Sequence, residues 1–503
     1  MKKIFNIVLV SVSAAALLAS CDLELTPKGS ISYDPENIIT NETDLNGFRA
    51  GVLANFRGLE YGSMDWVSDI QMDYFNAVQG YGNNGGDVHK ANKEMTASSY
   101  NTEANWTTCY YAINKFNIVI EGAKEVPSDL SEAAAVARGE AFLGRAVAYT
   151  HLARHFAKPY GSSSSTDLCV PLVTVYDQTA RPARATVQEI YTQIKTDLDS
   201  AAVLLAGVKG AANSIYPTID AVNAAYARYY IDTKDYTNAA ASAMKVIETG
   251  TYKLASTAEE LAKVNVNDGG TEAIVQFYAS LTEGIGYHSY YTQMSKDNDH
   301  GMYYSPYYIP TAALVDAYDE GDFRKAVWFD KTNYYCYINS GWHKDEFYVF
   351  TKYIGNPNLT SSGIPNAGNA VKPFMISEMY LIAAEAYAQS GNTASAKTVL
   401  NTLQAARGAK ETDGSMTSVK KEWFRETVGE GLRMSCLKRW GEGYTTRAAQ
   451  EAAIETTVVM EGTDYTQKSL PASDYHFVWP VPTYEMQVNL NLVQNEGYAD
   501  TAE

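Results

Sequence analysis

Apolar residues recur every three to four positions over much of the chain, which is the period of an amphipathic α-helix. Between residues 45 and 59, for example, they fall at Phe48, Val52, Leu53 and Phe56. The same period predicts helices at about 106–123, 131–155, 186–206, 219–233, 236–248, 373–390 and 392–407. The pattern therefore predicts an all-α protein.

Several of these predicted helices form pairs joined by a short polar turn. The helices at about 219–233 and 236–248 form one pair, and those at about 373–390 and 392–407 form another, which turns at Ser390-Gly391. In both pairs Ala lines the start of the second helix, so that the two helices can pack closely. This is the logic of tetratricopeptide-type helical hairpins. Because the pairs are not in tandem, we predict a scaffold of helix pairs that carries irregular segments.

The stretch from about 265 to 370 lacks the helical period. It is rich in Tyr, Gly, Asn and Asp, and short strands are expected only at 273–277 and 347–353. Long irregular loops on a rigid scaffold usually hold function. We therefore predict that residues 45–503 form a domain of helix pairs with a few short strands, in which 265–370 is a loop-rich insertion.

The N-terminus has the pattern of a bacterial lipoprotein signal. Lys2 and Lys3 precede an uncharged, mostly apolar run that is too short to span a bilayer comfortably. The run ends at Leu-Ala-Ser-Cys, whose last residue, Cys21, offers a thiol for attachment of diacylglycerol. We predict a signal peptide over 1–20, a lipid on Cys21 and a polar tether over 21–44. An ordinary secreted protein with a chance cysteine is the alternative.

Composition and spacing exclude several classes of function. The formal net charge of −18 repels phosphate backbones, so we expect no nucleic-acid partner. The later cysteines, at 109, 169, 336 and 436, show no C-x-x-C spacing, so we expect buried free thiols and no zinc site. Asp297-Asn298-Asp299 and the segment 265–270 offer oxygen ligands without the spacing of an EF-hand. We predict neither a metal nor a cofactor.

Charged residues near the C-terminal end give no clear catalytic motif. Glu430, Arg433 and Arg439 could form an anion-binding or catalytic cluster, but we expect them, like Asp322 and Arg324, to form buried ion pairs between helices. No pair of acidic residues is marked by the sequence as glycosidase carboxylates, and neither a G-x-S-x-G elbow nor a phosphate-binding glycine loop is present. We therefore predict that the protein is not an enzyme.

Aromatic residues are the main candidates for ligand contact, because the sequence has 38 Tyr and 7 Trp. Flat Tyr and Trp rings on exposed loops can stack on the C–H faces of sugars, with amide and carboxylate groups beside them. Packing inside the protein, or contact with a partner, is the alternative for each. The predicted ligand-binding residues are Trp66, Tyr74, Tyr81, Asn83, Tyr290, Tyr291, Asp297, Asn298, Tyr303, Tyr304, Tyr307 and Trp342, with Asn84, Tyr287 and Tyr308 as further candidates.

Several short motifs occur in a fixed order along the chain. They include Arg145-Ala-Val-Ala-Tyr149, Gly429-Glu-Gly-Leu-Arg433 and Trp479-Pro-Val-Pro482. The segments that carry them are 138–173, 184–205, 221–254, 378–387, 429–441 and 479–498, which span nearly the whole chain after the signal. Taken in this order, they resemble the SusD/RagB family of Bacteroidetes outer-membrane lipoproteins. The chain departs from the family pattern at Trp423, Thr427, Leu490 and Glu496.

The resemblance implies a fold of four tetratricopeptide-type helix pairs on the cell surface, anchored in the outer membrane by a lipid. It also implies that the protein captures a glycan and passes it to a SusC-like TonB-dependent transporter. Three alternatives stay open. The same fold could bind peptides or glycopeptides for import, the protein could degrade polysaccharide, or it could be a scaffold that binds only its transporter.

Overall fold

The computed structural model describes residues 38–60, 63–90, 95–283, 286–287, 291–461 and 468–499. The predicted signal peptide, Cys21, the first part of the tether and Tyr290 lie outside the described residues. Helix α2 (Glu42–Gly58) begins inside the predicted tether, because the side chain of Asn41 accepts a hydrogen bond from the Asp44 amide and caps the helix. No helix in the described ranges is both long and apolar enough to cross a membrane.

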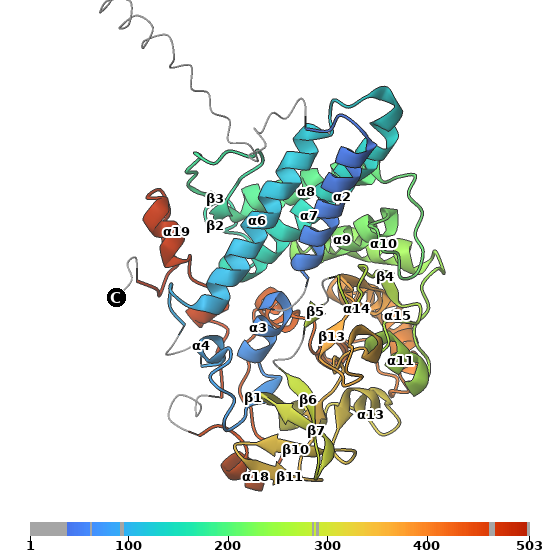
Figure 1. Cartoon of the computed structure of the whole chain (residues 1–503), viewed down its shortest axis with the longest axis vertical. Coiled ribbons are helices and arrows are strands. Elements are labelled where there is room, and N and C mark those ends of the chain that lie inside the picture. Colours follow the sequence, from blue (N-terminus) through green and yellow to red (C-terminus); the bar gives the residue numbers. More distant parts are fainter. Residues whose placement is uncertain are drawn as a thin grey trace, which may run out of the picture.

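Long helices form most of the molecule, which confirms the predicted all-α class. In Figure 1 they occupy the upper and right-hand parts of the picture, and each packs on its neighbour in chain order, α6 on α7 and so on to α14 on α15. Antiparallel neighbours joined by short turns are typical of tetratricopeptide-type repeats. The helices are α6 (Tyr100–Gly122), α7 (Ser131–Phe156), α8 (Val187–Leu204), α9 (Ile219–Asp232), α10 (Tyr236–Ile247), α14 (Ile376–Gln389) and α15 (Thr393–Ala406).

Local chemistry explains where these helices begin and how closely they pack. Thr186 and Glu189 form a capping box at the start of α8, in which each side chain satisfies a backbone N–H of the other residue. At the contact between α6 and α7, a Cβ on Gly144 would lie 2.6 Å from the ring of Phe116. Only glycine therefore lets the two helices approach so closely there.

Shorter helices connect these pairs to the rest of the chain. Several end or begin in the region that we expected to be irregular. They are α3 (Ser63–Gln71), α4 (Gly86–His89), α11 (Ala258–Asn265), α12 (Ala312–Val315), α13 (Arg324–Trp328), α16 (Met416–Glu426), α17 (Arg433–Trp440), α18 (Ala452–Thr457) and α19 (Thr483–Val488), with 3₁₀ turns at Ser128–Leu130, Pro357–Leu359 and Tyr475–Phe477.

The insertion contains more strand than its sequence predicted. The two expected strands are present as β4 (Ala273–Val275) and β12 (Val349–Phe350), but the largest sheet has four strands in the order β11-β10-β7-β6. Its strands are β6 (Thr292–Asp297), β7 (Gly301–Pro306), β10 (Tyr335–Ile338) and β11 (Gly341–His343). Strands of three to six residues give only a weak alternation of polar and apolar residues, which is easily missed in the sequence.

Within the described ranges there are also five two-stranded sheets, most of which join segments far apart in the chain. Their partners are β1 (Phe75–Ala77) with β8 (Tyr308–Pro310), β2 (Leu168–Pro171) with β3 (Arg184–Thr186), β4 with β14 (Phe374–Met375), β5 (Gly286–Tyr287) with β13 (Gly368–Asn369), and β9 (Phe329–Asp330) with β12.

Buried ion pairs fix the insertion against the helix scaffold. Arg407, at the end of α15, donates to Glu426 of α16 at 2.6 Å and to Glu272, just before β4, at 2.7 Å. Arg324, at the start of α13, donates to Glu426 at 2.7 Å and to Glu422 at 2.6 Å. All five side chains are buried. Burial by itself raises the pKa of the Glu426 carboxyl, but Arg407 and Arg324 together hold it well below its ordinary value.

Of the other predicted pairs between helices, the buried one is confirmed for Arg439 of α17 and Glu385 of α14, whereas Glu430 and Arg433 are half-buried and bind residues outside the helices. Arg433 donates to Asp73 through two hydrogen bonds of 2.8 Å, and Arg439 does the same with Glu385. Glu430 accepts from Lys352 at 2.6 Å. These pairs connect residues far apart in the sequence, as the planar fork of Arg is suited to do.

Replacing Arg407 by Met should destabilise the protein, because Glu272 and Glu426 would lose a buried counter-charge. Loss of one partner of a buried ion pair typically costs about 3–5 kcal/mol. Urea unfolding followed by far-UV circular dichroism measures the effect. Lys124→Met, which removes the exposed pair with Glu121, is the control and should change the unfolding free energy by about 0.5 kcal/mol or less. Equal stability of the two variants would contradict the role given to Arg407.

Candidate functional site

The four-stranded sheet carries aromatic side chains on one face. It lies at the bottom of Figure 1, whereas α2 lies in the upper half of the picture. The register places Tyr303 opposite Tyr335 and Tyr337 opposite Trp342. Because side chains alternate between the faces of a sheet and paired residues share a face, these four rings lie on the same side.

The opposite face of this sheet packs on the core. Tyr304, Cys336 and Ile338 alternate with the residues above and are buried. The hydroxyl of Tyr304 donates to the Asp330 carboxylate at 2.8 Å, so its polar end is satisfied inside the protein. This division between a buried and a solvent-facing side fixes which rings a ligand can reach.

Trp342 lies at the centre of the aromatic face. Its ring centroid is 5.0 Å from that of Tyr303, 4.8 Å from that of Tyr337 and 6.1 Å from that of Tyr335. His300 stacks on it at 3.7 Å with an interplanar angle of 18°. Tyr335 and Tyr337 remain 38% and 36% exposed. We call His300, Tyr303, Tyr335, Tyr337 and Trp342 the aromatic face; it offers flat apolar rings to solvent.

Polar groups border the aromatic face. Asp297 accepts a hydrogen bond from the His300 amide at 2.6 Å and lies 3.2 Å from its Nδ1, which orients the imidazole on Trp342. The neighbouring Asn298 is exposed. At the β10–β11 turn, Asn339 and Ser340 both have positive φ, which suits a two-residue hairpin turn.

The glycine-rich loop after β1 reaches the same turn. The Asn339 amide donates to Gln79 at 3.3 Å, and Gly80 is so close that a Cβ there would lie 3.3 Å from the Asn339 Cα. Asn83, farther along this loop, is exposed. Segments separated by more than 200 residues therefore meet at one edge of the aromatic face.

The structure corrects several predicted ligand-binding residues. We expected exposed rings on loops, but Trp66, Tyr74, Tyr81, Tyr291 and Tyr304 are buried, as is the further candidate Tyr308. Helix and strand packing explains this: Trp66 lies in α3, the Tyr74 ring packs on Phe424 and the Tyr291 ring on Phe75. Tyr307 is half-buried against the core. Of the predicted residues, Tyr303, Trp342, Asp297 and Asn298 come together at the sheet.

Sequence reasoning missed three residues of the aromatic face. Tyr335 and Tyr337 alternate with Cys336 and Ile338, which is the period of a strand with one buried side. Four residues are too few for this signal to stand out from chance. His300 gives no signal in the sequence, because its role depends on Trp342, which is 42 positions away.

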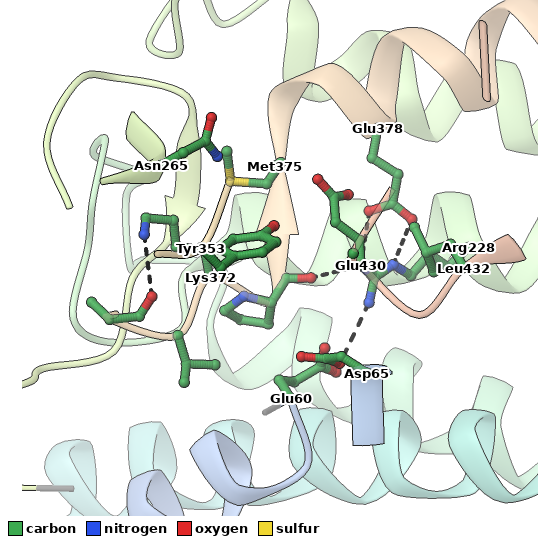
Figure 2. A pocket seen from close by; sticks show the side chains of 14 residues that line it. Glu60, Asp65, Arg228, Asn265, Tyr353, Lys372, Met375, Glu378, Glu430 and Leu432 are labelled. Atoms are coloured by element: carbon green, nitrogen blue, oxygen red, sulfur yellow. Dashed lines mark hydrogen bonds and ion pairs between the residues drawn. The ribbon is translucent and has the colours of Figure 1, made fainter. Parts of the chain in front are cut away.

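A second feature is a small acidic cavity between the helix scaffold and the insertion, with a volume of about 60 Å³. Figure 2 shows Arg228 between Glu378 on one side and Glu60 and Asp65 on the other. Arg228 binds Glu378 through two hydrogen bonds of 2.8 Å and lies 4.0 Å from Glu60. The Glu430 carboxylate also lines the cavity. Such a volume holds a few water molecules.

Carboxylates outnumber cations around this cavity, and burial shifts their pKa values. Burial, and then the charges of Glu60 and Asp69, hold the pKa of Asp65 well above its ordinary value. Burial raises the pKa of Asp69 to about 7, although the backbone N–H groups of Gly431 and Gly429 donate to this carboxylate and lower it. Protonation therefore relieves part of the negative charge here.

Among the described residues no cluster of His, Cys, Asp and Glu side chains suits a metal ion. In the segment 265–270, the Asp268 carboxylate is occupied by the Lys372 ammonium at 2.6 Å and by the Asn356 amide at 2.8 Å. A lysine thus takes the position that a cation would need. Cys109, Cys169, Cys336 and Cys436 are free and buried, which confirms the prediction.

The fold is a helix-pair scaffold that carries a sheet with one aromatic face, and two family models match the chain. A model described as "SusD family" matches residues 224–498, more than half of the chain. A second, described as "starch-binding associating with outer membrane", matches residues 32–231. The chain therefore belongs to the SusD/RagB family. No curated protein matches it.

Solved structures share the fold. A SusD superfamily protein from Bacteroides thetaiotaomicron is 23% identical, with a TM-score of 0.74 over 90% of this chain and 99% of that one. The surface glycan-binding protein A from Bacteroides fluxus is 18% identical, with a TM-score of 0.70 over 91% and 100%. A laminarin-binding SusD-like protein is 21% identical, with a TM-score of 0.66 over 91% and 100%. At these identities the likeness extends to the fold alone.

Replacing Asp69 by Asn should stabilise the protein increasingly as pH rises. The folded-state pKa of about 7 lies above the ordinary 3.8, so the folded state binds this proton more tightly and stability is lost as pH rises through that window. The variant's advantage in unfolding free energy should reach about 4 kcal/mol at pH 8 and vanish near pH 4. Thermal unfolding at pH 4, 6 and 8 measures it. Asp129→Asn, at an exposed position, is the control. A pH-independent difference between Asp69→Asn and wild type would contradict the assignment.

Proposed function

We propose that this protein is a cell-surface glycan-binding lipoprotein that captures oligosaccharides without chemical change. The observation that carries the proposal is the aromatic face, where Tyr303, Tyr335, Tyr337 and Trp342 share one side of a sheet and two of the rings stay exposed. Exposing several apolar rings to water costs free energy, and binding a ligand over them recovers part of it. The apolar C–H face of a sugar ring is complementary to such a surface.

The surroundings of the rings suit hydroxyl-rich ligands. Asp297, Asn298 and the tyrosine hydroxyls supply hydrogen-bond acceptors and donors at the edge of the aromatic face. Stacking with hydrogen bonds binds a sugar but provides no acid, base or nucleophile aimed at a glycosidic bond. The proposed function is therefore binding rather than hydrolysis. Two of the similar structures are named as a surface glycan-binding protein and a laminarin-binding protein, which supports a binding function.

The proposal extends to the protein's place in the cell. The lipid on Cys21 would anchor it to the outer membrane, on the side that faces the exterior, and a SusC-like TonB-dependent transporter would receive the captured glycan. The family description that names association with the outer membrane supports the location. Two or more acyl chains suffice for stable anchoring.

The aromatic face is tested by calorimetric titration with a panel of laminari-, malto-, cello- and xylo-oligosaccharides. One class should bind, and the double variant Tyr335→Ala/Tyr337→Ala should bind it at least tenfold more weakly, because each lost ring contact contributes about 1 kcal/mol. Tyr335→Phe/Tyr337→Phe keeps the rings and should stay near wild type.

A matched control removes exposed tyrosines elsewhere. Tyr100 and Tyr111 on α6 are both exposed, and their replacement by Ala should leave the affinity unchanged. Far-UV circular dichroism checks that all variants keep their helices. Wild-type affinity in the Tyr335→Ala/Tyr337→Ala protein, or binding of no glycan in the panel, would refute the proposed site.

Cys21→Ser should release the protein from the membrane, because a serine hydroxyl does not replace the thiol that receives the lipid. In a Bacteroidetes host, detergent phase partition should move the protein from the detergent phase to the aqueous phase. External protease should digest the wild-type protein on intact cells if it faces the exterior. Membrane retention of the Cys21→Ser protein would contradict the anchor, and protease resistance would contradict the outward orientation.

A further inference from the structure

A larger groove lies between the end of α7, helix α17 and the C-terminal segment, with a volume of about 940 Å³. Its lining residues come from 158–184, 437–442, 471–478 and 494–497, and include none from the four-stranded sheet. It is therefore separate from the aromatic face. Two of its lining residues, Lys438 and Arg184, are cations that are each only 8% exposed.

Lys438 has no carboxylate partner among the described residues. Its ammonium donates to the backbone oxygens of Arg154 and, at 2.7 Å, Ala157, and its third N–H has no acceptor within the described part of the chain. The charge of Asp232 raises the pKa of Lys438 without a hydrogen bond between them. That carboxylate already accepts a hydrogen bond from Arg154 at 2.7 Å and lies 3.5 Å from Arg439. Burial lowers the pKa of Lys438 to about 7, against smaller opposing effects of Cys169 and Asp232.

Arg184 likewise has no carboxylate partner among the described residues. Its guanidinium donates to the backbone oxygens of Cys169, Leu168 and Val493 and, at 2.7 Å, to the Asn495 side-chain oxygen, all of which are uncharged. Burial lowers its pKa as well. The amide of Asn495 donates in turn to Phe156, next to the carbonyl that Lys438 uses. Lys438 and the Asn495 partner of Arg184 thus bind adjacent carbonyls at the end of α7, which places the two cations near each other.

The acidic residues of this groove do not compensate these cations. Asp474 accepts from His476 at 2.6 Å, and Glu442 binds Lys420 at 2.5 Å. Asp167 and Glu496 lie 3.8 and 3.9 Å from the exposed Lys158. A nearly buried charge without a counter-ion is costly, so an anion that reaches Lys438 and Arg184 is stabilised.

We propose that this groove binds an acidic saccharide, with the carboxylate of a uronic acid unit directed at Lys438 and Arg184. Tyr475 lines the same groove, and its ring is 41% exposed for contact with a sugar face. The hydroxyls of Ser163 and Ser473 and the outer carboxylates suit sugar hydroxyls. A peptide offers neither a sugar C–H face for Tyr475 nor the row of hydroxyls for these polar groups, so a saccharide matches the groove better. The site uses residues outside the aromatic face and goes beyond the proposed function.

Calorimetric titration of residues 22–503 with trigalacturonic acid, and with a neutral galactose trisaccharide, tests the proposal. The acidic trisaccharide should bind at least tenfold more tightly, and added salt should weaken only its binding. Lys438→Gln keeps an N–H donor but loses the charge, and should weaken binding at least tenfold. Lys158→Gln, at an exposed position on the same groove, should change it less than threefold. Equal affinity for the two trisaccharides, no binding, or wild-type affinity in Lys438→Gln overturns the proposal.

Further measurements keep the result clear if Lys438→Gln fails to fold. Arg184→Gln should show the same loss. In the wild-type protein at pH 7, binding should take up a fraction of a proton, because a bound carboxylate raises the pKa of Lys438; titrations in two buffers of different ionisation enthalpy measure it. Absence of uptake overturns the assignment to Lys438.

Two comparisons separate this site from others. The Tyr335→Ala/Tyr337→Ala protein should bind trigalacturonic acid like wild type, and a loss there would place the binding at the aromatic face instead. An acetylated tri-glutamate peptide should bind more weakly than the saccharide. Tighter binding of the peptide would overturn the saccharide assignment.

Discussion

Two carboxylates of α16, those of Glu422 and Glu426, hold the insertion against the helix scaffold. Arg407 approaches Glu426 from the end of α15, and Arg324 approaches both carboxylates from α13. Each charge is buried, so removing any one leaves its partners without compensation in a medium that solvates them poorly. The position of the four-stranded sheet relative to the helix pairs depends on this network, because α13 and the strands that follow it belong to the same segment of chain.

A sheet held in this way can leave one face open to solvent. Cys336 and Ile338 pack inward, and Tyr335 and Tyr337, which alternate with them along β10, point outward. The inward residues supply the stability, so the outward rings are free to serve a ligand. His300, held by Asp297, stacks on Trp342 and limits the movement of its ring. Preorganised rings lose little conformational entropy on binding.

The distribution of charge is more informative than the net charge of −18. In the acidic cavity carboxylates are in excess, and protonation of Asp69 and Asp65 relieves the repulsion. In the groove beside α17 the carboxylates are paired with other groups, whereas Lys438 and Arg184 have no carboxylate partner among the described residues. Protonation relieves the first arrangement. In the groove Lys438 can lose its proton, but Arg184 keeps its charge at neutral pH and is stabilised by an anion, which is why we assign a ligand only to the groove.

The sequence by itself determined the helix pairs, because the helical period acts over short distances. It also indicated free thiols and ion pairs at Arg433 and Arg439, but not the distant partners Asp73 and Glu385. It also marked Tyr303 and Trp342. It could not show that Trp66, Tyr74 and Tyr291 are buried, since a tyrosine or tryptophan has the same sequence signature inside and outside. Only the tertiary structure decided this, and it alone brought Tyr335, Tyr337 and His300 to Trp342. Their contacts depend on strand register between distant segments, which no local pattern encodes.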